Sequence, residues 1–464
     1  MSLKAQQLPP LKLAPVDPQV REIISQSGLP DYAWGVVMLP IPPSEKLPAQ
    51  LKGVGLNAQL PMNPASLMKL VTTRAALGLL GPQYRHRTRI ATTGRLEAGV
   101  LKGDLFFQGG GDPKLVVEDL AQIAQQLRAI GIHRIEGAVV IDGTRFAEPE
   151  VDPGQFDGKP FSAYNVGAHA AMVNFKAVKV SVWPQAGGEI AVFTEPRIPE
   201  TEIASRVQLV EGGCKATSVQ ARMDDRARLS VTGTMGKRCD GVDFYVAVLD
   251  HARFAFKAFI AAWEDAGGSI QARLATGPTP SHARTLIDWR SPRPLIELVS
   301  DINKMSNNPM TRNLFLNLSA EQSGSGTRAA SYQAVRDYLR SQGLDFPELV
   351  MENGSGLSRQ ERIAPQNLAR LLAQALYAPD AESWILTLPT AGAEGTVRHR
   401  FRQTELQGRA WLKTGALEDV RGLAGYLFSA SGQWVVLVLL VNHPEASKAR
   451  SSLDALVKWA HTNN

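Results

Sequence analysis

Apolar residues recur at helical spacing between residues 63 and 80 of the 464-residue chain. They stand at Leu67, Leu70, Val71 and Leu77. Intervals of three and four residues place such side chains on one face of a helix. Asn63 and Pro64 favour a helix start, and Gly81-Pro82 is a sequence that ends one. The pattern therefore predicts a helix over residues 63–80, after a strand over residues 31–40.

Short β-like runs separated by glycine and proline fill the middle of the chain, from about residue 91 to residue 284. One predicted helix, over residues 117–130, interrupts them. The final part predicts helices at residues 294–303 and 309–318, strands at 409–414, 422–429 and 434–442, and a closing helix at 445–460. This order predicts an antiparallel sheet covered by helices, with one or two β-rich domains inserted between its parts.

Composition places the chain among globular proteins and narrows the function classes. Hydrophobic residues make up 44% and charged residues 20%, and the length favours two or three domains. The 50 Lys and Arg exceed the 44 Asp and Glu by 6, without the dense basic blocks of a nucleic-acid-binding protein, so we expect no nucleic-acid partner. A pI near 9.2 is compatible with loose association with an anionic cell wall or membrane.

Three features bear on where the protein resides. The apolar run from Trp434 to Val441 is shorter than the roughly 20 residues of a membrane helix and reads as a buried strand. The start, Met1 to Gln7, lacks the apolar core of a secretory signal, so either the protein is cytoplasmic or another start replaces the signal. Cys214 and Cys239 are too few for a structural zinc site. They form either one disulfide, which would favour an exported protein, or two unpaired buried thiols.

Three short motifs carry the candidate chemistry: Ser66-Leu67-Met68-Lys69, Ser306-Asn307-Asn308 and Lys413-Thr414-Gly415. Each motif alone is a weak signal, and the first two patterns would occur by chance in many proteins of this size. Their order, Ser-x-x-Lys, then Ser-x-Asn, then Lys-Thr-Gly, makes a joint catalytic role the stronger interpretation.

Ser66 and Lys69 are three residues apart near the start of the predicted helix, so their side chains share one face. A serine hydroxyl becomes a nucleophile when a base takes its proton, and a lysine amine is such a base once burial or a second cation such as Lys413 lowers its pKa. The alternative is a serine that is merely near a helix start and a solvated lysine. The apolar surface around them is too broad for an exposed helix, which favours the catalytic interpretation.

The Ser306-Asn307-Asn308 segment falls in a predicted break between two helices. Alone, and followed by Pro309, it is an ordinary turn and helix-start sequence. Beside the other two motifs, Ser306 is expected to pass a proton between Lys69 and the leaving amine. Asn308 is expected to orient Lys69 or to hold a substrate amide carbonyl.

The Lys413-Thr414-Gly415 segment falls at the end of a predicted strand. Lys413 and Thr414 are expected to bind a substrate carboxylate, and the missing side chain of Gly415 to let an extended peptide lie along the strand edge. The backbone N–H groups of Ser66 and Ala416 would form an oxyanion hole at the helix N-terminus. The alternative is an ordinary junction of strand and turn.

In this order the motifs resemble those of penicillin-binding proteins and serine β-lactamases. The chain is similar, over nearly its whole length, to the low-molecular-mass class C group of D-alanyl-D-alanine carboxypeptidases and endopeptidases. Further segments carry this resemblance: Gly109–Pro113, Glu352–Arg359, Leu388–Gly392 with Gly395-Thr396, Lys413–Leu417 and Gly422–Tyr426. Two positions depart from the family pattern, Ala416 where threonine is common and Asn353 where aspartate is expected.

The resemblance implies an α/β (α+β) fold. A serine β-lactamase-like transpeptidase domain of antiparallel sheet and helices would carry two inserted β-rich domains. The expected peptidase domain comprises residues 1–90 and 287–464, the second domain residues 91–166 and 252–286, and the third residues 167–251. Because the family acts on peptidoglycan, the resemblance also implies export to the periplasm or the cell exterior.

The implied activity is that of a penicillin-sensitive serine D,D-peptidase. It would cleave D-Ala-D-Ala or D-Ala-meso-diaminopimelate bonds of peptidoglycan stem peptides through an acyl-Ser66 intermediate, without a metal or cofactor, and β-lactam antibiotics would be trapped at the acyl stage. By resemblance, Arg359 and the stretch from Asp157 to Phe161 line the pocket for the residue before D-alanine. Two other interpretations stay open, a β-lactamase or esterase with the same nucleophile and a non-catalytic cell-wall scaffold. The oligomeric state is open as well.

Overall fold

The chain divides into two compact units. The computed structural model describes residues 8–42, 49–185, 187–224 and 228–464. Unit 1 comprises residues 1–84 and 293–464, and unit 2 comprises residues 85–292. The start from Met1 to Gln7, on which the signal-peptide expectation rests, lies outside the described residues. Unit 1 is therefore interrupted in sequence by the whole of unit 2.

Unit 1 is built on a six-stranded sheet in the order β1-β3-β2-β19-β18-β17. In that order the strands are β1 (Leu11–Pro15), β3 (Leu51–Leu56), β2 (Trp34–Ile41), β19 (Trp434–Asn442), β18 (Val420–Phe428) and β17 (Ala410–Ala416). Neighbouring strands are antiparallel except β1 and β3, which are parallel. The central strand β19 is buried on both faces, which explains its continuous apolar run.

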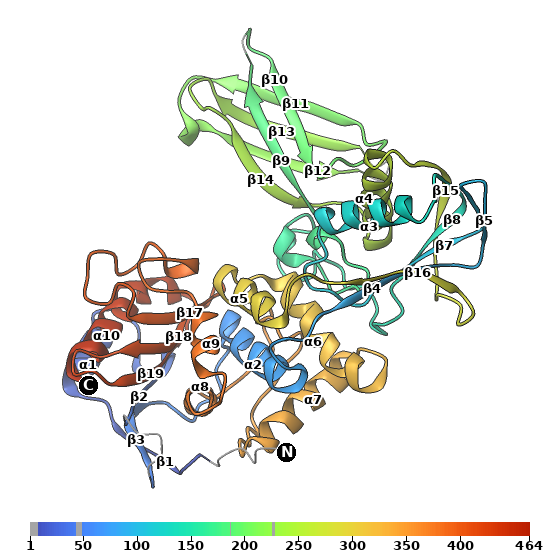
Figure 1. The fold of residues 1–464 in the computed structure, drawn as a ribbon. Coiled ribbons are helices and arrows are strands. Elements are labelled where there is room, and N and C mark those ends of the chain that lie inside the picture. Colours follow the sequence, from blue (N-terminus) through green and yellow to red (C-terminus); the bar gives the residue numbers. More distant parts are fainter. Residues whose placement is uncertain (1–7, 43–48, 186, 225–227) are drawn as a thin grey trace. The chain divides into compact units, whose positions relative to one another are not determined.

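Helices cover both faces of this sheet (Figure 1). They are α1 (Pro18–Ser25), α2 (Met68–Leu80), α5 (Leu295–Met305), α6 (Asn308–Ser323), α7 (Arg328–Ser341), α8 (Pro365–Leu376), α9 (Ala381–Leu386) and α10 (Arg450–Asn463). On one face, α1 and α10 pack on alternate side chains of the strands, among them Val36 and Leu437. On the other face, α8 lies against β2 and β19, and α2 packs beside α5, α6 and α7. No helix in the described part of the chain has both the length and the apolar character needed to cross a membrane.

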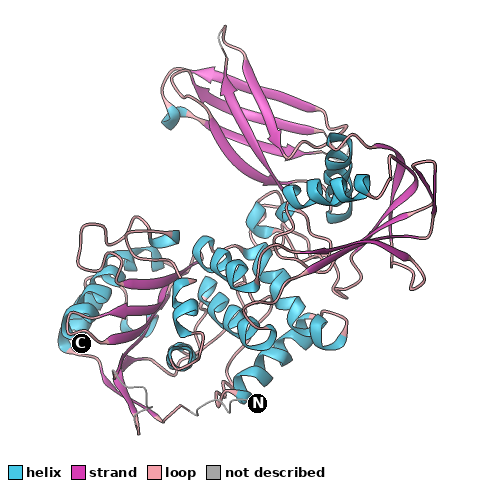
Figure 2. Ribbon diagram, viewed as in Figure 1, coloured by secondary structure: helices cyan, strands magenta, loops and turns pink. Residues whose placement is uncertain are grey.

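Strands dominate unit 2 (Figure 2). Its largest sheet has the order β16-β4-β7-β8-β6-β5, with β15 paired to β8. These strands are β16 (Arg284–Arg290), β4 (Arg87–Thr92), β7 (Leu105–Gln108), β8 (Arg134–Asp142), β6 (Val100–Lys102), β5 (Arg95–Glu97) and β15 (Ser269–Thr276). Two helices, α3 (Val117–Ala129) and α4 (His251–Asp265), pack against each other and share its apolar core.

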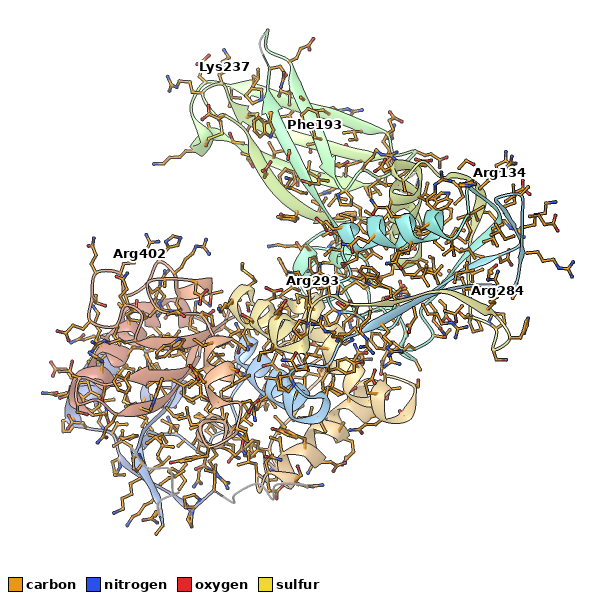
Figure 3. All side chains as sticks on the ribbon, in the orientation of Figure 1. Arg134, Phe193, Lys237, Arg284, Arg293 and Arg402 are labelled. Carbon is orange, nitrogen blue, oxygen red and sulfur yellow. A yellow bond between two sulfur atoms is a disulfide. The ribbon has the colours of Figure 1, made fainter. Side chains whose placement is uncertain are left out.

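Two three-stranded sheets complete unit 2. One has the order β10 (Ile190–Glu195), β9 (Ala177–Pro184), β14 (Val242–Ala247), and the other β11 (Ile203–Val210), β13 (Leu229–Gly236), β12 (Ser218–Met223). Along β9, Val178, Val180 and Val182 are buried in the core of unit 2. Phe193 of β10 is 59% exposed on the outer face (Figure 3). This alternation is the source of the β-like sequence texture.

Cys214 and Cys239 form a disulfide, with their Cα atoms 4.6 Å apart. This pairing decides between the two alternatives that the sequence left open. The bridge joins the segment between β13 and β14 to the segment between β11 and β12.

The domain boundaries expected near residues 90 and 287 fall inside β4 and β16. These two strands pair with each other, and β4 also pairs with β7. Because their backbone groups are satisfied by the unit 2 sheet, the junctions lie instead at Tyr84-Arg85 and Pro292-Arg293. The further division of unit 2 at residues 167 and 251 stays a prediction.

Candidate active site

Ser66 lies in a tight turn at the entrance to α2. The helix expected over residues 63–80 begins as a 3-10 turn, η2 (Ala65–Leu67), and continues as α2. Asn63 Oδ1 accepts the N–H of Ala65 at 2.9 Å, and Ala65 has a positive φ of 45°. Left-handed backbone at a residue other than glycine costs about 1–3 kcal/mol. The serine is thus held in a strained turn at a helix N-terminus, which is a typical setting for a nucleophile.

Asn63 ties this turn to the central sheet. Its N–H donates to Asn442 Oδ1 at 2.8 Å, and Asn442 Nδ2 donates to the carbonyl oxygen of Asn63 at 3.0 Å. Asn442 is the last residue of β19. The rigid sheet therefore positions the turn that carries Ser66.

Lys69 is fully buried, and its amine lies among polar atoms from three segments. Nζ is 3.1 Å from Ser66 Oγ and 2.6 Å from Asn308 Oδ1, and it donates to the carbonyl oxygen of Ser355. Asn308 is the first residue of α6. The fold thus brings the first two motifs together, although 239 positions separate Lys69 from Asn308.

The surroundings of Lys69 favour its neutral form. Burial lowers its pKa well below the ordinary lysine value, and the charges of Lys413 and Arg312 lower it further, whereas the charge of Glu361 opposes the shift. A neutral amine within hydrogen-bond reach of a serine hydroxyl can accept its proton. The pair therefore meets both the geometric and the electrostatic requirement for an activated nucleophile.

Ser306 occupies the left-handed position at the end of α5. Its φ is 56°, where glycine is the usual residue. Lys413 Nζ donates to Ser306 Oγ at 2.8 Å and to the carbonyl oxygen of Thr414 at 2.9 Å. A serine at this costly position is explained by its hydroxyl, which the turn holds beside Lys413.

Lys413 is also fully buried, and burial lowers its pKa to about 7. Its amine therefore exchanges between charged and neutral forms near neutral pH. The charged form can bind a carboxylate, and a group with this pKa can also carry a proton through Ser306.

The Lys-Thr-Gly motif lies on β17, at the edge of the unit 1 sheet (Figure 1). Leu412 donates its N–H away from β18, to the carbonyl oxygen of Pro389 at 2.8 Å. Backbone groups of a strand alternate in direction, so the N–H groups of Thr414 and Ala416 point toward the same outer edge. The end of β17 is thus able to pair with an extended peptide.

Gly415 lies against the turn that carries the nucleophile. A Cβ on Gly415 would come within 2.7 Å of the carbonyl oxygen of Pro64. The sequence interpretation gave this glycine the task of making room for a substrate beside the edge, whereas the structure requires it for the close approach of β17 to η2. Next to it, Thr414 Oγ1 donates to Thr396 Oγ1 at 2.9 Å, at an exposed position.

Arg359 lies in unit 1, at the surface near the same turn. Its guanidinium is 3.9 Å from the carboxylate of Asp419, between β17 and β18. The preceding residue, Ser358, accepts a hydrogen bond from Asn63 Nδ2 at 2.9 Å. Arg359 therefore belongs to the neighbourhood of Ser66, and its contact with a substrate stays a prediction.

Asp157 and Phe161 belong to unit 2. Partial burial acts to raise the pKa of Asp157, but hydrogen bonds from Tyr164 and Asn165, each at 2.7 Å, outweigh it and lower the pKa. Phe161 lines a cavity of unit 2 together with Lys176. Their assignment to a substrate pocket stays a prediction.

Sequence reasoning missed three residues around Lys69: Arg312, Ser355 and Glu361. Ser355 acts through its backbone carbonyl, and the two charged residues look like ordinary surface charges in the sequence. The one available signal was the segment from Glu352 to Arg359, which the family resemblance singled out. In the described ranges, no group of three or more His, Cys, Asp or Glu side chains is placed to hold a metal ion.

Comparison with known proteins places this geometry in a family context. The family model for the D-Ala-D-Ala carboxypeptidase 3 (S13) family matches residues 16–463. A D-alanyl-D-alanine carboxypeptidase of Actinomadura sp. is 30% identical over 448 residues, which cover 93% of this chain and 82% of that protein. The carboxypeptidase DacB of Haemophilus influenzae is 25% identical over 389 residues, 82% of this chain and 80% of the relative.

Solved structures show the same fold. The crystal structure of penicillin-binding protein 4 from Haemophilus influenzae superposes with a TM-score of 0.79 at 22% identity and covers 96% of this chain and 99% of that one. A peptidoglycan endopeptidase of Bdellovibrio bacteriovorus has a TM-score of 0.54 at 15% identity and covers 92% of each chain. The expected penicillin-binding fold, with additional sheets, is confirmed.

Proposed function

The chain belongs to the D-Ala-D-Ala carboxypeptidase 3 (S13) family and is a serine D-Ala-D-Ala carboxypeptidase, and we propose that Ser66 is its nucleophile and Lys69 its general base. The observation that carries this assignment is the buried Lys69 amine, with its lowered pKa, 3.1 Å from Ser66 Oγ. Burying a lysine side chain costs free energy, so a fully buried lysine calls for a functional explanation. Here its task is to take the serine proton.

Acylation would proceed in balanced steps. Lys69 takes the proton of Ser66, whose oxygen attacks the carbonyl carbon of the penultimate D-alanine. The negative oxygen that forms accepts hydrogen bonds from the backbone N–H groups of Ser66 and Ala416. The C–N bond then breaks, and the leaving amine receives the proton from Lys69 by way of Ser306. Water later hydrolyses the ester and restores the serine.

The terminal carboxylate would bind at the end of β17. The charged form of Lys413 and the hydroxyl of Thr414 supply the positive charge and the donor that a carboxylate needs. The outward N–H of Ala416 leaves the strand edge open to an extended peptide, and Gly415 lets β17 lie close to the turn that carries Ser66. Asn308, which accepts from Lys69 at 2.6 Å, orients the base.

We propose that the natural substrates are peptidoglycan stem peptides and that the protein acts outside the cytoplasm. The family activity supports both statements, because D-Ala-D-Ala ends occur in the cell wall. Arg359, which lies near the turn of Ser66, would contact the residue before D-alanine. The names of two relatives support further proposals for this chain: endopeptidase action on cross-links, and acylation by β-lactams such as the one in complex with the Haemophilus protein.

The experiment is intact-protein mass spectrometry after incubation with benzylpenicillin, with wild type and Ser66→Ala side by side. We expect one stable adduct per chain in the wild type and none in the variant. Rapid hydrolysis of the drug without a lasting adduct would favour a β-lactamase or esterase. The absence of both adduct and hydrolysis would leave the non-catalytic scaffold. An adduct that persists in Ser66→Ala would move the nucleophile to another residue.

A further inference from the structure

Glu361 is a fully buried carboxylate close to the candidate active site. Its Oε1 accepts three successive backbone N–H groups, from Glu352 at 3.3 Å, Asn353 at 3.1 Å and Gly354 at 3.0 Å. Successive N–H groups that converge on one oxygen form an anion-binding nest. Its other oxygen, Oε2, is buried and has no hydrogen-bond partner among the described residues. An oxygen left in this state needs an explanation.

The segment that Glu361 holds is the one that contacts Lys69. Thr72 Oγ1, on α2, donates to the carbonyl oxygen of Gly354 at 2.7 Å, and the next residue, Ser355, accepts a hydrogen bond from Lys69. Any displacement of the three N–H groups bound by Glu361 would therefore move the acceptor of the Lys69 amine.

The same segment also touches the nucleophile. A Cβ on Gly356, whose φ is +81°, would lie 1.9 Å from the carbonyl oxygen of Ala65 and 2.7 Å from the nitrogen of Ser66. This contact leaves no free space between the segment and the turn. Residues 352–356 therefore support both partners of the proposed proton transfer.

Charge adds a second role. The charged groups that act on Lys69 in the described residues come from three elements: Lys413 on β17, Arg312 on α6, and Glu361 in the segment before α8. Arg312 also faces Glu352. When Lys69 takes the serine proton it becomes a third cation beside Lys413 and Arg312. The carboxylate of Glu361 is the group that offsets this charge.

We infer that Glu361 is a positioning residue for acylation: it holds residues 352–356 against Ser66 and Lys69 and supplies the negative charge against which Lys69 becomes protonated. The inference rests on the proposed roles of Ser66 and Lys69. Burial raises the pKa of Glu361 to about 7, and the charge of Lys69 opposes this rise. We therefore expect the two groups to titrate as a coupled pair.

The test is the pH dependence of Ser66 acylation by benzylpenicillin in full-length Glu361→Gln. Glutamine keeps an oxygen for the three N–H groups but removes the charge. Without that charge the protonated form of Lys69 is less stable, so the acid limb of the rate should move to lower pH by about one unit. Because Lys69 is then a weaker base, the plateau rate should fall about tenfold. An acid limb at the wild-type pH would overturn the inference.

Two further variants separate the effect of the Glu361 charge from its effect on the position of residues 352–356. Glu352→Gln removes a carboxylate from the same segment, but one that faces Arg312 and binds Ser358, so its acid limb should stay at the wild-type pH. Thr72→Val loosens the hold on Gly354 without changing any charge and should lower the plateau with an unmoved limb. If the acid limb of the acylation rate shifted as far in Glu352→Gln as in Glu361→Gln, the effect would be a general one of charge, and the role of Glu361 would be rejected.

A measurement on the wild type covers the case in which Glu361→Gln does not fold. Carbon-13 NMR of labelled lysine and glutamate should show Lys69 and Glu361 titrating in linked steps. A single independent step for Lys69 would overturn the inference. Failure of the wild type to acylate would instead overturn the proposed function, so the two failures are distinguishable.

Discussion

The amine of Lys413 donates to Ser306 Oγ at 2.8 Å and thereby joins the second and third motifs across 107 positions of sequence. The hydroxyl is held by the left-handed turn at the end of α5, and the amine by the edge strand β17. Because the turn and the strand fix the positions of both groups, the contact exists before a substrate binds.

Replacing Ser306 should test this contact. Ser306→Ala removes the proposed proton path to the leaving amine, so kcat/KM for a D-Ala-D-Ala peptide should fall by about 10²- to 10⁴-fold. Steady-state hydrolysis kinetics would measure this fall in kcat/KM. Thermal unfolding of the variant would check that it folds. Ser323→Ala, at the exposed end of α6, is the matched control and should keep wild-type kinetics. Unchanged hydrolysis in Ser306→Ala would remove Ser306 from the mechanism.

The pH dependence of kcat/KM should reflect the protonation state of Lys413. Its pKa is lowered to about 7 by burial, so the amine is charged below that pH and neutral above it. Carboxylate binding needs the charged form, and kcat/KM for a peptide with a free C-terminal carboxylate should therefore decline above about pH 7.

Lys413→Arg provides the comparison for this profile. A guanidinium stays charged throughout the range, so the descending limb should disappear even if the overall rate is lower. A wild-type profile that keeps rising well above pH 7 would contradict the proposed role of Lys413 in carboxylate binding.

Gly356 should be intolerant of a side chain for a reason that Gly81 does not share. Both have left-handed φ, +81° and +83°, but a Cβ at Gly356 meets Ala65 and Ser66, whereas a Cβ at Gly81 meets nothing within 4 Å. Gly356→Ala should displace the nucleophile and slow acylation by about 100-fold. Gly81→Ala, also at a positive φ but in open space, should acylate at the wild-type rate. Equal rates in both variants would reject the packing argument.

Loss of the disulfide should lower the stability of unit 2 without slowing the acylation of Ser66. Closing a loop of 25 residues between Cys214 and Cys239 corresponds to about 3.5 kcal/mol of stabilisation on the chain-entropy model. Urea unfolding of the double serine variant should show this loss. Penicillin acylation in the absence of denaturant should be unaffected, because Ser66, Lys69 and their bonded partners all lie in unit 1. A large drop in acylation would contradict this separation.

Much of the architecture and the motif residues could be predicted from local sequence. Periodicity and end signals, which act over a few residues, predict the helix that follows Ser66, the helix after Ser306 and the buried strand from Trp434. The pairing of Ser66 with Lys69 follows from a spacing of three along one helix. These features depend on residues that are close together in the chain, so they can be predicted from the sequence alone.

Other features were decided by contacts between distant segments. The burial that lowers the pKa of Lys69, the meeting of Lys413 with Ser306 and the position of Glu361 depend on segments that are far apart in the chain and adjacent only in the fold. The disulfide, the place of β4 and β16 in the unit 2 sheet and the reason for Gly415 follow in the same way. Desolvation and close packing are properties of the assembled core. The packed core brings the three short motifs together, and burial lowers the pKa of their two lysines.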